Sequence, residues 1–339
     1  MILNFLSQCR LGLGPTKSIT AALVGPRPNL PICKRKLRIA YTSLFCFFLS
    51  NQNGCAATPN TFIYIANNSG NTVSRCLIDS TTGSLSDCIP TGSQLSGPEG
   101  IRINPAGTFI YMANNDNHTV TKCTLNKISG LLSECETTGF GFSIPAGINF
   151  HPAGTFAYVA NYNGFAVSLC SVHPTTGLFD HCEMTGGRFS GPADIAFNVS
   201  GTHAYIANVD NDTISLCSVN STSGALTHCR STGSAFQQPE GITLNPAGSF
   251  AYITNGGSNS ISVCSIDAAD GTLTACKTTD YRFDGLGKIA TNSTGALGFV
   301  PSANDKRVYA CTINTTGEFS ECIDTGGTGL NGPAGIEMF

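Results

Sequence analysis

The chain has 339 residues, of which 41% are apolar and 12% are charged, with 38 glycines and no tryptophan. It is long enough to bury a large core, and its Gly and Thr content favours strands and turns over helices. Residues 58–339 hold 11 Lys and Arg against 21 Asp and Glu. This acidic balance argues against a nucleic-acid partner, because it repels phosphates.

The first 57 residues contain seven basic residues and no acidic one. The basic stretch 34–38 precedes an apolar run, Ile39 to Leu49, and then small residues, which is the layout of a secretory signal peptide. The run is too short for a transmembrane helix, so no membrane span is predicted. We expect residues 1–57 to be an N-terminal extension with a signal peptide, and the mature protein to be exported, whether periplasmic, on the cell surface or secreted.

Other interpretations of this segment stay open. An N-terminal anchor or a mitochondrial-type presequence would also be free of acidic residues, and the true start codon could lie nearer Lys34. Cys55 could be lipidated, but "QNGC" is a poor lipoprotein box, so its removal is favoured.

From residue 61 onwards the sequence consists of six similar units, and equivalent positions lie 47 residues apart. The motif "TFIYIANNSGNTVSRC" of the first unit aligns without a gap with "TFIYMANNDNHTVTKC" of the second. The units begin at residues 61, 108, 155, 202, 249 and 296. A fixed period between 20 and 50 residues is typical of solenoids, propellers and arrays.

Turn signals divide each unit into four short runs of strand length. In the third unit these runs lie at 148–151, 155–160, 166–172 and 178–184, and we name them A, B, C and D. Four short antiparallel strands per unit predict an all-β, six-bladed β-propeller formed by residues 58–339. A β-solenoid is the alternative, but it would need shorter coils.

The units begin at strand B, and the chain ends in a strand A, "GPAGIEMF". We therefore expect the C-terminal strand to complete the N-terminal blade, so that no sheet edge is free at the seam. Arg102 and Glu337 occupy equivalent A-strand positions on the two sides of this seam. Their charged ends are predicted to meet near the central channel.

Twelve cysteines form one pair per unit, on strands C and D around a turn. The spacing suits a hairpin disulfide and not a zinc site. We expect one disulfide in each blade, with a shorter turn and a different strand register in the last. The pairs are Cys76–Cys88, Cys123–Cys135, Cys170–Cys182, Cys217–Cys229, Cys264–Cys276 and Cys311–Cys322.

An aromatic series recurs once per unit in strand B and is predicted to pack between blades rather than to form a site. Its members are Tyr64, Tyr111, Tyr158, Tyr205, Tyr252 and Phe299.

The B-to-C and D-to-A connections should share one face of the propeller, because consecutive strands alternate in direction. These connections vary most between units, so we expect any functional site there. The candidate ligand-binding residues are Arg188, Arg282, Glu99, Asp194, Glu240, Lys288, Tyr162 and Phe165.

Arg188 and Arg282 stand at the same repeat position two blades apart. With acidic residues near the channel mouth they are predicted to form an anion- or lactone-binding cleft. A solvated rim of mixed charge is the alternative.

No phosphate-binding loop, zinc motif or nucleophile elbow occurs in the sequence, so neither a cofactor nor a metal is predicted. Calcium binding by the "NDN" and "DND" loops lacks the regular spacing of an EF-hand. The six histidines occupy different positions in different units and form no visible cluster. No catalytic residue can therefore be assigned from motifs.

The motifs "YVAN", "YIAN" and "YITN", followed by an Asn/Gly-rich turn, a "VS" strand and "TTG", resemble YVTN-type β-propeller repeats. They also resemble the related lactonase-like family typified by 6-phosphogluconolactonase. The resemblance covers residues 61–339 and implies a propeller fold. Lactonases of that family typically have seven blades, whereas six are expected here, and no catalytic motif can be carried over by position.

Three functions are compatible with this pattern. The favoured one is an exported, non-enzymatic module, monomeric, that binds a protein or a glycan through its variable face. The alternative is a lactonase-like hydrolase of a sugar or organic-acid lactone. The two functions differ in how the titratable groups are placed. An enzyme needs two or three of them together in one water-excluding pocket, whereas a binding module does not. A structural repeat within a surface assembly is the third.

Overall fold

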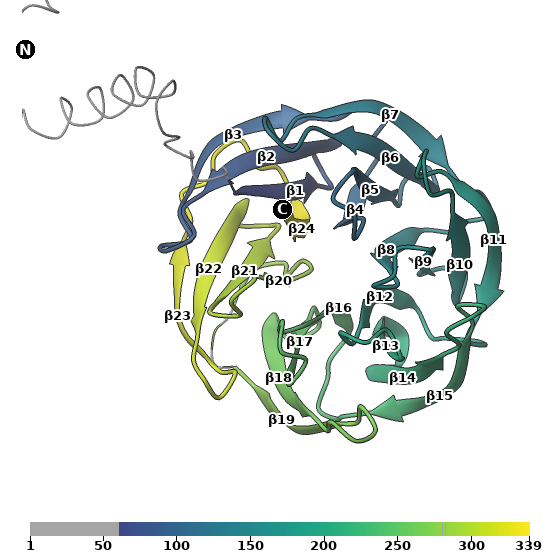
Figure 1. The fold of residues 1–339 in the computed structure, drawn as a ribbon. Coiled ribbons are helices and arrows are strands. Elements are labelled where there is room, and N and C mark those ends of the chain that lie inside the picture. Colours follow the sequence, from purple (N-terminus) through teal and green to yellow (C-terminus); the bar gives the residue numbers. More distant parts are fainter. Residues whose placement is uncertain (1–60, 280, 282) are drawn as a thin grey trace, which may run out of the picture. The chain divides into compact units, whose positions relative to one another are not determined.

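The computed structural model describes residues 61–279, 281 and 283–339. In this part of the chain, six four-stranded antiparallel sheets are arranged around a central axis as the blades of a β-propeller (Figure 1). The predicted all-β, six-bladed fold is confirmed. The predicted N-terminal extension and signal peptide lie outside the described residues. No helix in the described ranges is long and apolar enough to cross a membrane.

Each blade has strand A innermost and strand D outermost. Blade 1 consists of β24 (Pro333–Met338), β1 (Phe62–Asn67), β2 (Thr72–Ile78) and β3 (Leu85–Thr91). Blade 2 consists of β4 (Pro98–Ile103), β5 (Phe109–Asn114), β6 (Thr119–Leu125) and β7 (Leu132–Thr138). Blade 3 consists of β8 (Pro145–Phe150), β9 (Phe156–Asn161), β10 (Ala166–Val172) and β11 (Phe179–Thr185).

The other three blades repeat this order. Blade 4 consists of β12 (Pro192–Phe197), β13 (His203–Asn208), β14 (Thr213–Val219) and β15 (Leu226–Thr232), with a 3-10 turn, η1 (Val209–Asn211), after β13. Blade 5 consists of β16 (Pro239–Leu244), β17 (Phe250–Asn255), β18 (Ser260–Ile266) and β19 (Leu273–Thr278). Blade 6 consists of β20 (Ala290–Thr291), β21 (Leu297–Ser302), β22 (Arg307–Ile313) and β23 (Phe319–Asp324).

The ring closes as the sequence predicts. The C-terminal strand β24 pairs antiparallel with β1, with Ile336 opposite Ile65. Each A strand also contacts the A strand of the next blade, from β24 through β4, β8, β12, β16 and β20 back to β24. Both sides of the seam are therefore covered by paired or packed strands.

One strand departs from the expectation. Strand A of blade 6 was expected around Ile289, but β20 begins after it and has only two residues. The Lys288 backbone N–H donates to the carbonyl of Ala334 in the neighbouring A strand, at 2.6 Å. Only an isolated bridge, Leu286 with Ser302, continues the pairing with β21. Because the Lys288 backbone N–H donates to the next blade, it cannot also donate to β21 in its own sheet.

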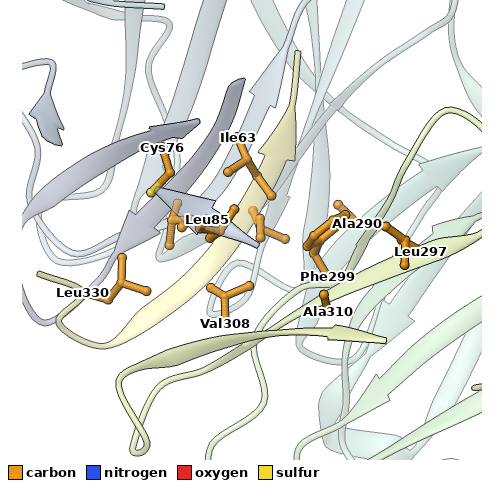
Figure 2. Packing of buried hydrophobic residues seen from close by; sticks show 11 residues of the cluster. Ile63, Cys76, Leu85, Ala290, Leu297, Phe299, Val308, Ala310 and Leu330 are labelled. Atoms are coloured by element: carbon orange, nitrogen blue, oxygen red, sulfur yellow. The ribbon is translucent and has the colours of Figure 1, made fainter. Parts of the chain in front are cut away.

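The core lies between neighbouring blades. At the seam, Ile63 and Leu85 of blade 1 pack against Phe299 and Val308 of blade 6 (Figure 2). The recurrent strand-B aromatics are fully buried, as predicted. Four of them donate a hydroxyl hydrogen bond to a glycine carbonyl in the next blade, as Tyr205 does to Gly271 at 2.7 Å. Apolar packing thus joins neighbouring blades, and at four of the six junctions a buried hydrogen bond is added.

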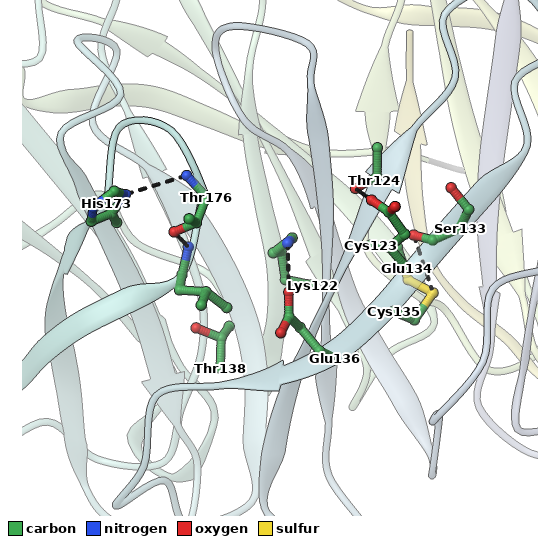
Figure 3. Close-up of polar contacts among 12 residues, drawn as sticks. Lys122, Cys123, Thr124, Ser133, Glu134, Cys135, Glu136, Thr138, His173 and Thr176 are labelled. Atoms are coloured by element: carbon green, nitrogen blue, oxygen red, sulfur yellow. Dashed lines mark hydrogen bonds and ion pairs between the residues drawn. A yellow bond between two sulfur atoms is a disulfide. The ribbon is translucent and has the colours of Figure 1, made fainter.

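All six predicted disulfides are present, one in each outer hairpin. Figure 3 shows the pair Cys123–Cys135 beside the Lys122–Glu136 ion pair of the same hairpin. The turn of blade 6 is one residue shorter, as expected, but the expected change of register is wrong. Cys311 pairs with Cys322 and a one-residue shift follows, as around Cys170 in blade 3. The missing residue is absorbed by the turn.

Candidate functional site

The A strands line the central channel, and five of them begin with a β-bulge. A bulge inserts one extra residue and redirects its side chain. The residue that follows is glycine in four blades, where neighbouring A strands approach closely. A Cβ on Gly100 would lie 2.6 Å from the carbonyl oxygen of Ala146 in the next blade. At each of these two positions, most blades therefore have alanine or glycine.

Four charged residues interrupt this pattern of small residues. Glu99 and Glu240 occupy the bulge position of blades 2 and 5, where blades 1, 3 and 4 have alanine. Asp194 and Lys288 occupy the following position, in blades 4 and 6, where the other blades have glycine. The sequence singled out all four as candidates; the ring brings Glu99, Glu240 and Lys288 to one end of the channel, while Asp194 is more deeply buried.

Lys288 bridges blades at this end of the channel. It comes from blade 6, is 8% exposed, and its Nζ donates to Glu99 Oε1 of blade 2 at 2.6 Å. The other oxygen, Glu99 Oε2, accepts a hydrogen bond from Asn115 Nδ2 at 2.8 Å. Both oxygens of Glu99 are thus held by the protein.

A cavity of about 280 Å³ opens above this pair. We call it the central cavity. Its polar lining residues are Asn68, Ser69, Glu99, Asn115, Glu240 and Lys288. The cavity includes residues of B-to-C loops, namely Asn68, Ser69 and Asn115. It therefore lies on the face that carries the variable B-to-C and D-to-A connections, which we call the variable face. Asn115 Oδ1 is buried without a hydrogen-bond partner in the described structure.

Glu240 differs from Glu99 although the two share a repeat position. Where blade 2 has Asn115, blade 5 has Gly256, and a Cβ on Gly256 would overlap Glu240 Oε1. Among the described residues, no hydrogen bond or ion pair engages the Glu240 carboxylate. The repeat thus yields one carboxylate that is fully bonded and one that faces the cavity without a partner.

The electrostatics follow from burial and from the shared lysine. Burial raises the pKa of Glu240, Lys288 partly offsets this, and Glu99 raises the pKa further. Burial alone would lower the pKa of Lys288, but Glu99, Asp194 and Glu240 outweigh it and the net shift is upwards. Lys288 therefore stays cationic, while Glu240 takes up a proton more readily than an ordinary glutamate.

A second layer of charge lies deeper in the channel. Asp194 is 3% exposed, and its Oδ2 accepts the backbone N–H of Ile242 in the next blade, at 3.1 Å. Burial raises the pKa of Asp194, against the opposing charges of Lys288 and Arg102. The predicted contact across the seam is present, because Arg102 Nη1 lies 2.9 Å from Glu337 Oε2.

The other predicted residues lie elsewhere. Tyr162 is on the variable face, where its hydroxyl donates to Asp210 Oδ1 at 3.0 Å. Arg188 and Phe165 line a separate cavity beside blade 4 that shares no lining residue with the central one. Arg188 therefore does not join the acidic residues at the channel mouth. Arg282 lies outside the described residues.

Sequence reasoning missed Asn68, Ser69 and Asn115, because loop asparagines and serines are common in turns. A comparison of Asn115 with Gly256, which share a repeat position, would have shown that Glu99 has an amide partner and that Glu240 lacks one at that position. Among the described residues, no three His, Cys, Asp or Glu side chains are grouped so that they could hold a metal ion.

A protein-family model described as "Lactonase, 7-bladed beta-propeller" matches residues 55–147 and 145–284. The comparison with curated proteins found no match.

Solved structures share the fold at low sequence identity. A candidate 6-phosphogluconolactonase from Bacteroides fragilis is 15% identical, with a TM-score of 0.61, over 85% of this chain and 100% of its own. A periplasmic gluconolactonase from Pseudomonas aeruginosa is 15% identical, with a TM-score of 0.61, over 82% of this chain and 85% of its own. A chain of a nidogen/laminin complex is 10% identical, with a TM-score of 0.65, over 82% and 98%. At these identities the likeness concerns the fold alone.

Proposed function

Because the chain belongs to the lactonase, seven-bladed β-propeller family, we propose that it is a lactone hydrolase with the central cavity as its active site. It has six blades where the family's name gives seven. The observation that carries the proposal is Glu240, a half-buried carboxylate with a raised pKa and no partner among the described residues. It faces the same cavity as a buried ammonium group.

These two groups supply what lactone hydrolysis needs. Glu240 accepts a proton from a water molecule, whose oxygen attacks the ring carbonyl carbon. The ammonium group of Lys288, with donors beyond the one given to Glu99, stabilises the oxyanion that forms. The intermediate then expels the ring oxygen, which takes the proton back from Glu240. The product is an open-chain hydroxy acid.

Glu99 and Asn115 act as positioning residues in this proposal. Glu99 holds the Lys288 ammonium at 2.6 Å, and Asn115 holds Glu99 at 2.8 Å.

The charge of the cavity favours an uncharged polyhydroxy lactone over a phosphorylated one. Three carboxylates, Glu99, Asp194 and Glu240, surround a single lysine, so a phosphate would meet net repulsion. The sequence alone favoured a non-enzymatic binding role. A hydrolase, unlike a binding module, needs several titratable groups in one cavity. The presence of Glu99, Glu240 and Lys288 in the central cavity therefore supports the hydrolase.

We also infer that the protein is exported. Six disulfides persist only in an oxidising compartment, and this supports the interpretation of the N-terminal segment as a signal peptide. Detection of the mature chain, cut before residue 58, in an extracytoplasmic fraction would support this.

The proposal is tested with a panel of lactones and the purified, oxidised protein. The panel contains glucono-δ-lactone, its 6-phosphate and γ-butyrolactone, and acid release is measured above the uncatalysed rate. We expect turnover of glucono-δ-lactone with a higher kcat/KM than for the phosphate. No turnover of any lactone would contradict the proposed reaction, and preference for the phosphate would contradict its substrate class.

A further inference from the structure

The second cavity, of about 530 Å³, lies on the variable face beside blade 4. We call it the blade-4 groove. It is formed by η1, the first residues of β14, the outer strand β15, the β11–β12 connection and one loop of blade 3. The residues that matter for its chemistry are Phe165, Arg188, Ser190, Asn208, Asn211 and Ser215.

Phe165 departs from a pattern that four of the other five blades follow. The last residue of every B-to-C loop has positive φ, and in four blades its side chain accepts a backbone N–H from the next connection. Asn71 and Asn259 are two of these acceptors. Phe165 has no acceptor, yet it adopts φ +50, which is costly for a bulky residue. It is 36% exposed on the wall of the groove.

Arg188 is a cation without a carboxylate partner. Its guanidinium lies 5.6 Å from the centroid of the Phe165 ring, and no ion pair within the described chain engages it. The other arginine of the groove, Arg230, is paired with Asp270 at 3.0 Å. No Asp or Glu lines the groove, so the positive charge of Arg188 is uncompensated there.

Asn208 adds a buried group that lacks a partner. It is 1% exposed, and its Oδ1 accepts no hydrogen bond in the described structure. In blades 1, 2, 3 and 5 the equivalent oxygen accepts an N–H from the D-to-A connection, as Asn114 does from Ser96. The equivalent donor here would be the backbone N–H of Ser190, which makes no hydrogen bond to Asn208 Oδ1 in the described structure. The connection is thus not bonded to Asn208.

A second polar group of the groove, the hydroxyl of Ser215 on strand C, also makes no bond to the D-to-A connection. In blade 2, the Thr121 hydroxyl donates to the Gln94 carbonyl and ties the connection to strand C, at 2.8 Å. Ser215 holds the equivalent place in blade 4, and within the described chain its hydroxyl bonds only to Asn208. Among the described residues only blade 2 makes this contact, so the Ser215 hydroxyl, which lines the groove, is free to donate to a ligand.

We propose that the blade-4 groove binds an acidic saccharide, with a carboxylate or sulfate on Arg188 and a sugar ring near Phe165. The amide of Asn211 and the hydroxyl groups of Thr213 and Ser215 line the groove, and the Thr213 hydroxyl donates to Asn211 Oδ1 at 2.8 Å, which orients both groups for sugar hydroxyls. The orphan oxygen of Asn208 accepts a hydroxyl once the wall relaxes around the ligand. A volume of this size suits a disaccharide.

Calorimetric titration of the full oxidised protein tests this. The probes are a uronic-acid disaccharide, a sulfated disaccharide, a matched neutral disaccharide and an Asp/Glu-rich peptide. At least one acidic disaccharide is expected to bind at least about tenfold more tightly than the neutral one, because its hydrogen bond to arginine is charge-assisted. Arg188→Gln should lose that factor, whereas Arg307→Gln, an exposed arginine on the same face, should not.

Phe165→Asn separates binding from folding. It restores the acceptor that Asn71 and Asn259 provide, at a φ that asparagine tolerates, so the urea midpoint should rise while acidic-sugar binding is lost. Glu240→Gln should bind normally, which distinguishes the groove from the proposed active site. Binding of no saccharide, tighter binding of the peptide, or unchanged binding by Arg188→Gln or Phe165→Asn would overturn the proposal.

Discussion

Arg102 of blade 2 and Glu337 at the C-terminal end of the chain form an ion pair of 2.9 Å across the seam of the ring. Glu337 Oε1 also accepts the backbone N–H of Ile103 at 3.3 Å. The side chains are 23% and 12% exposed. The two charges thus link the last strand of the chain to the blade that follows it in the ring.

Removing one partner of this pair should leave a largely buried charge. Arg102→Gln is expected to cost about 2 kcal/mol of unfolding free energy, somewhat less than for a fully buried pair because both groups retain some solvent. Arg102→Gln combined with Glu337→Gln should recover part of that loss. A double-mutant cycle in urea measures the coupling, and a coupling near zero would show that the contact does not hold the seam.

Tyr205 and Tyr252 offer a matched pair of substitutions. Tyr205→Phe should cost about 1–2 kcal/mol, because it leaves the Gly271 carbonyl without its buried donor. The Tyr252 hydroxyl is buried without a partner in the described structure, and the turn glycine of blade 6, Gly317, lies in a turn that is one residue shorter and accepts no hydrogen bond from it. Tyr252→Phe should therefore be neutral or stabilising. Equal losses in urea unfolding would contradict this account.

Three buried carboxyls determine how stability depends on pH. Burial raises the pKa of Asp194, Glu240 and Glu337 in the folded protein, so the folded state binds these protons more tightly than the unfolded state. Their contribution to stability is therefore present at low pH and is lost as pH rises through the folded pKa values. The exposed groups with lowered pKa, such as Asp270 at about 2, act in the opposite direction but at lower pH.

The variant that isolates this effect is Asp194→Asn. It keeps an oxygen acceptor for the Ile242 N–H but has no proton to lose. Its urea midpoint should fall less than that of the unmodified protein between pH 5 and pH 7. A steeper fall in the variant would mean that burial does not dominate the titration of Asp194.

Gly256→Asn tests why Glu240 is free. It introduces at the same repeat position the amide that Asn115 donates to Glu99. Because its Cβ would overlap the present position of Glu240 Oε1, the carboxylate has to shift, and it should then accept that amide. We expect kcat for glucono-δ-lactone to fall at least about tenfold. Val209→Asn is the matched control, because it adds the amide at this position in blade 4, where Ala193 occupies the bulge. Full activity in Gly256→Asn would contradict the assigned role of Gly256.

The sequence was sufficient for the fold because each blade repeats the same local pattern. The six four-stranded units determine the number of blades. The strand A at the C-terminal end determines how the ring closes. The meeting of Arg102 and Glu337 followed from register alone. The short strand β20 could not be foreseen, because it results from the Lys288 backbone N–H, which donates to the next blade.

The site was only partly predictable. Glu99, Glu240 and Lys288 could be named because they interrupt a repeat, but their contacts across the channel depend on the radius of the ring. Arg188 was expected at the channel mouth, yet the β11–β12 connection carries it over the outer strands of blade 4. The sequence does not distinguish Asn208 from its equivalents, because asparagine occurs at this position in five blades. Asn208 differs only in that its Oδ1 lacks a hydrogen-bond donor in the described structure.

The role of Glu240 as general base is the central claim, and the pH profile of kcat/KM for glucono-δ-lactone tests it most directly. The unmodified protein should show an acid limb with an apparent pKa above the ordinary value for glutamate, because burial raises the pKa of Glu240. Glu240→Gln should lose this limb and about 100-fold in rate, whereas Glu183→Gln, an exposed carboxylate on β11, should keep both. An unchanged rate and acid limb in Glu240→Gln would contradict the proposed active site.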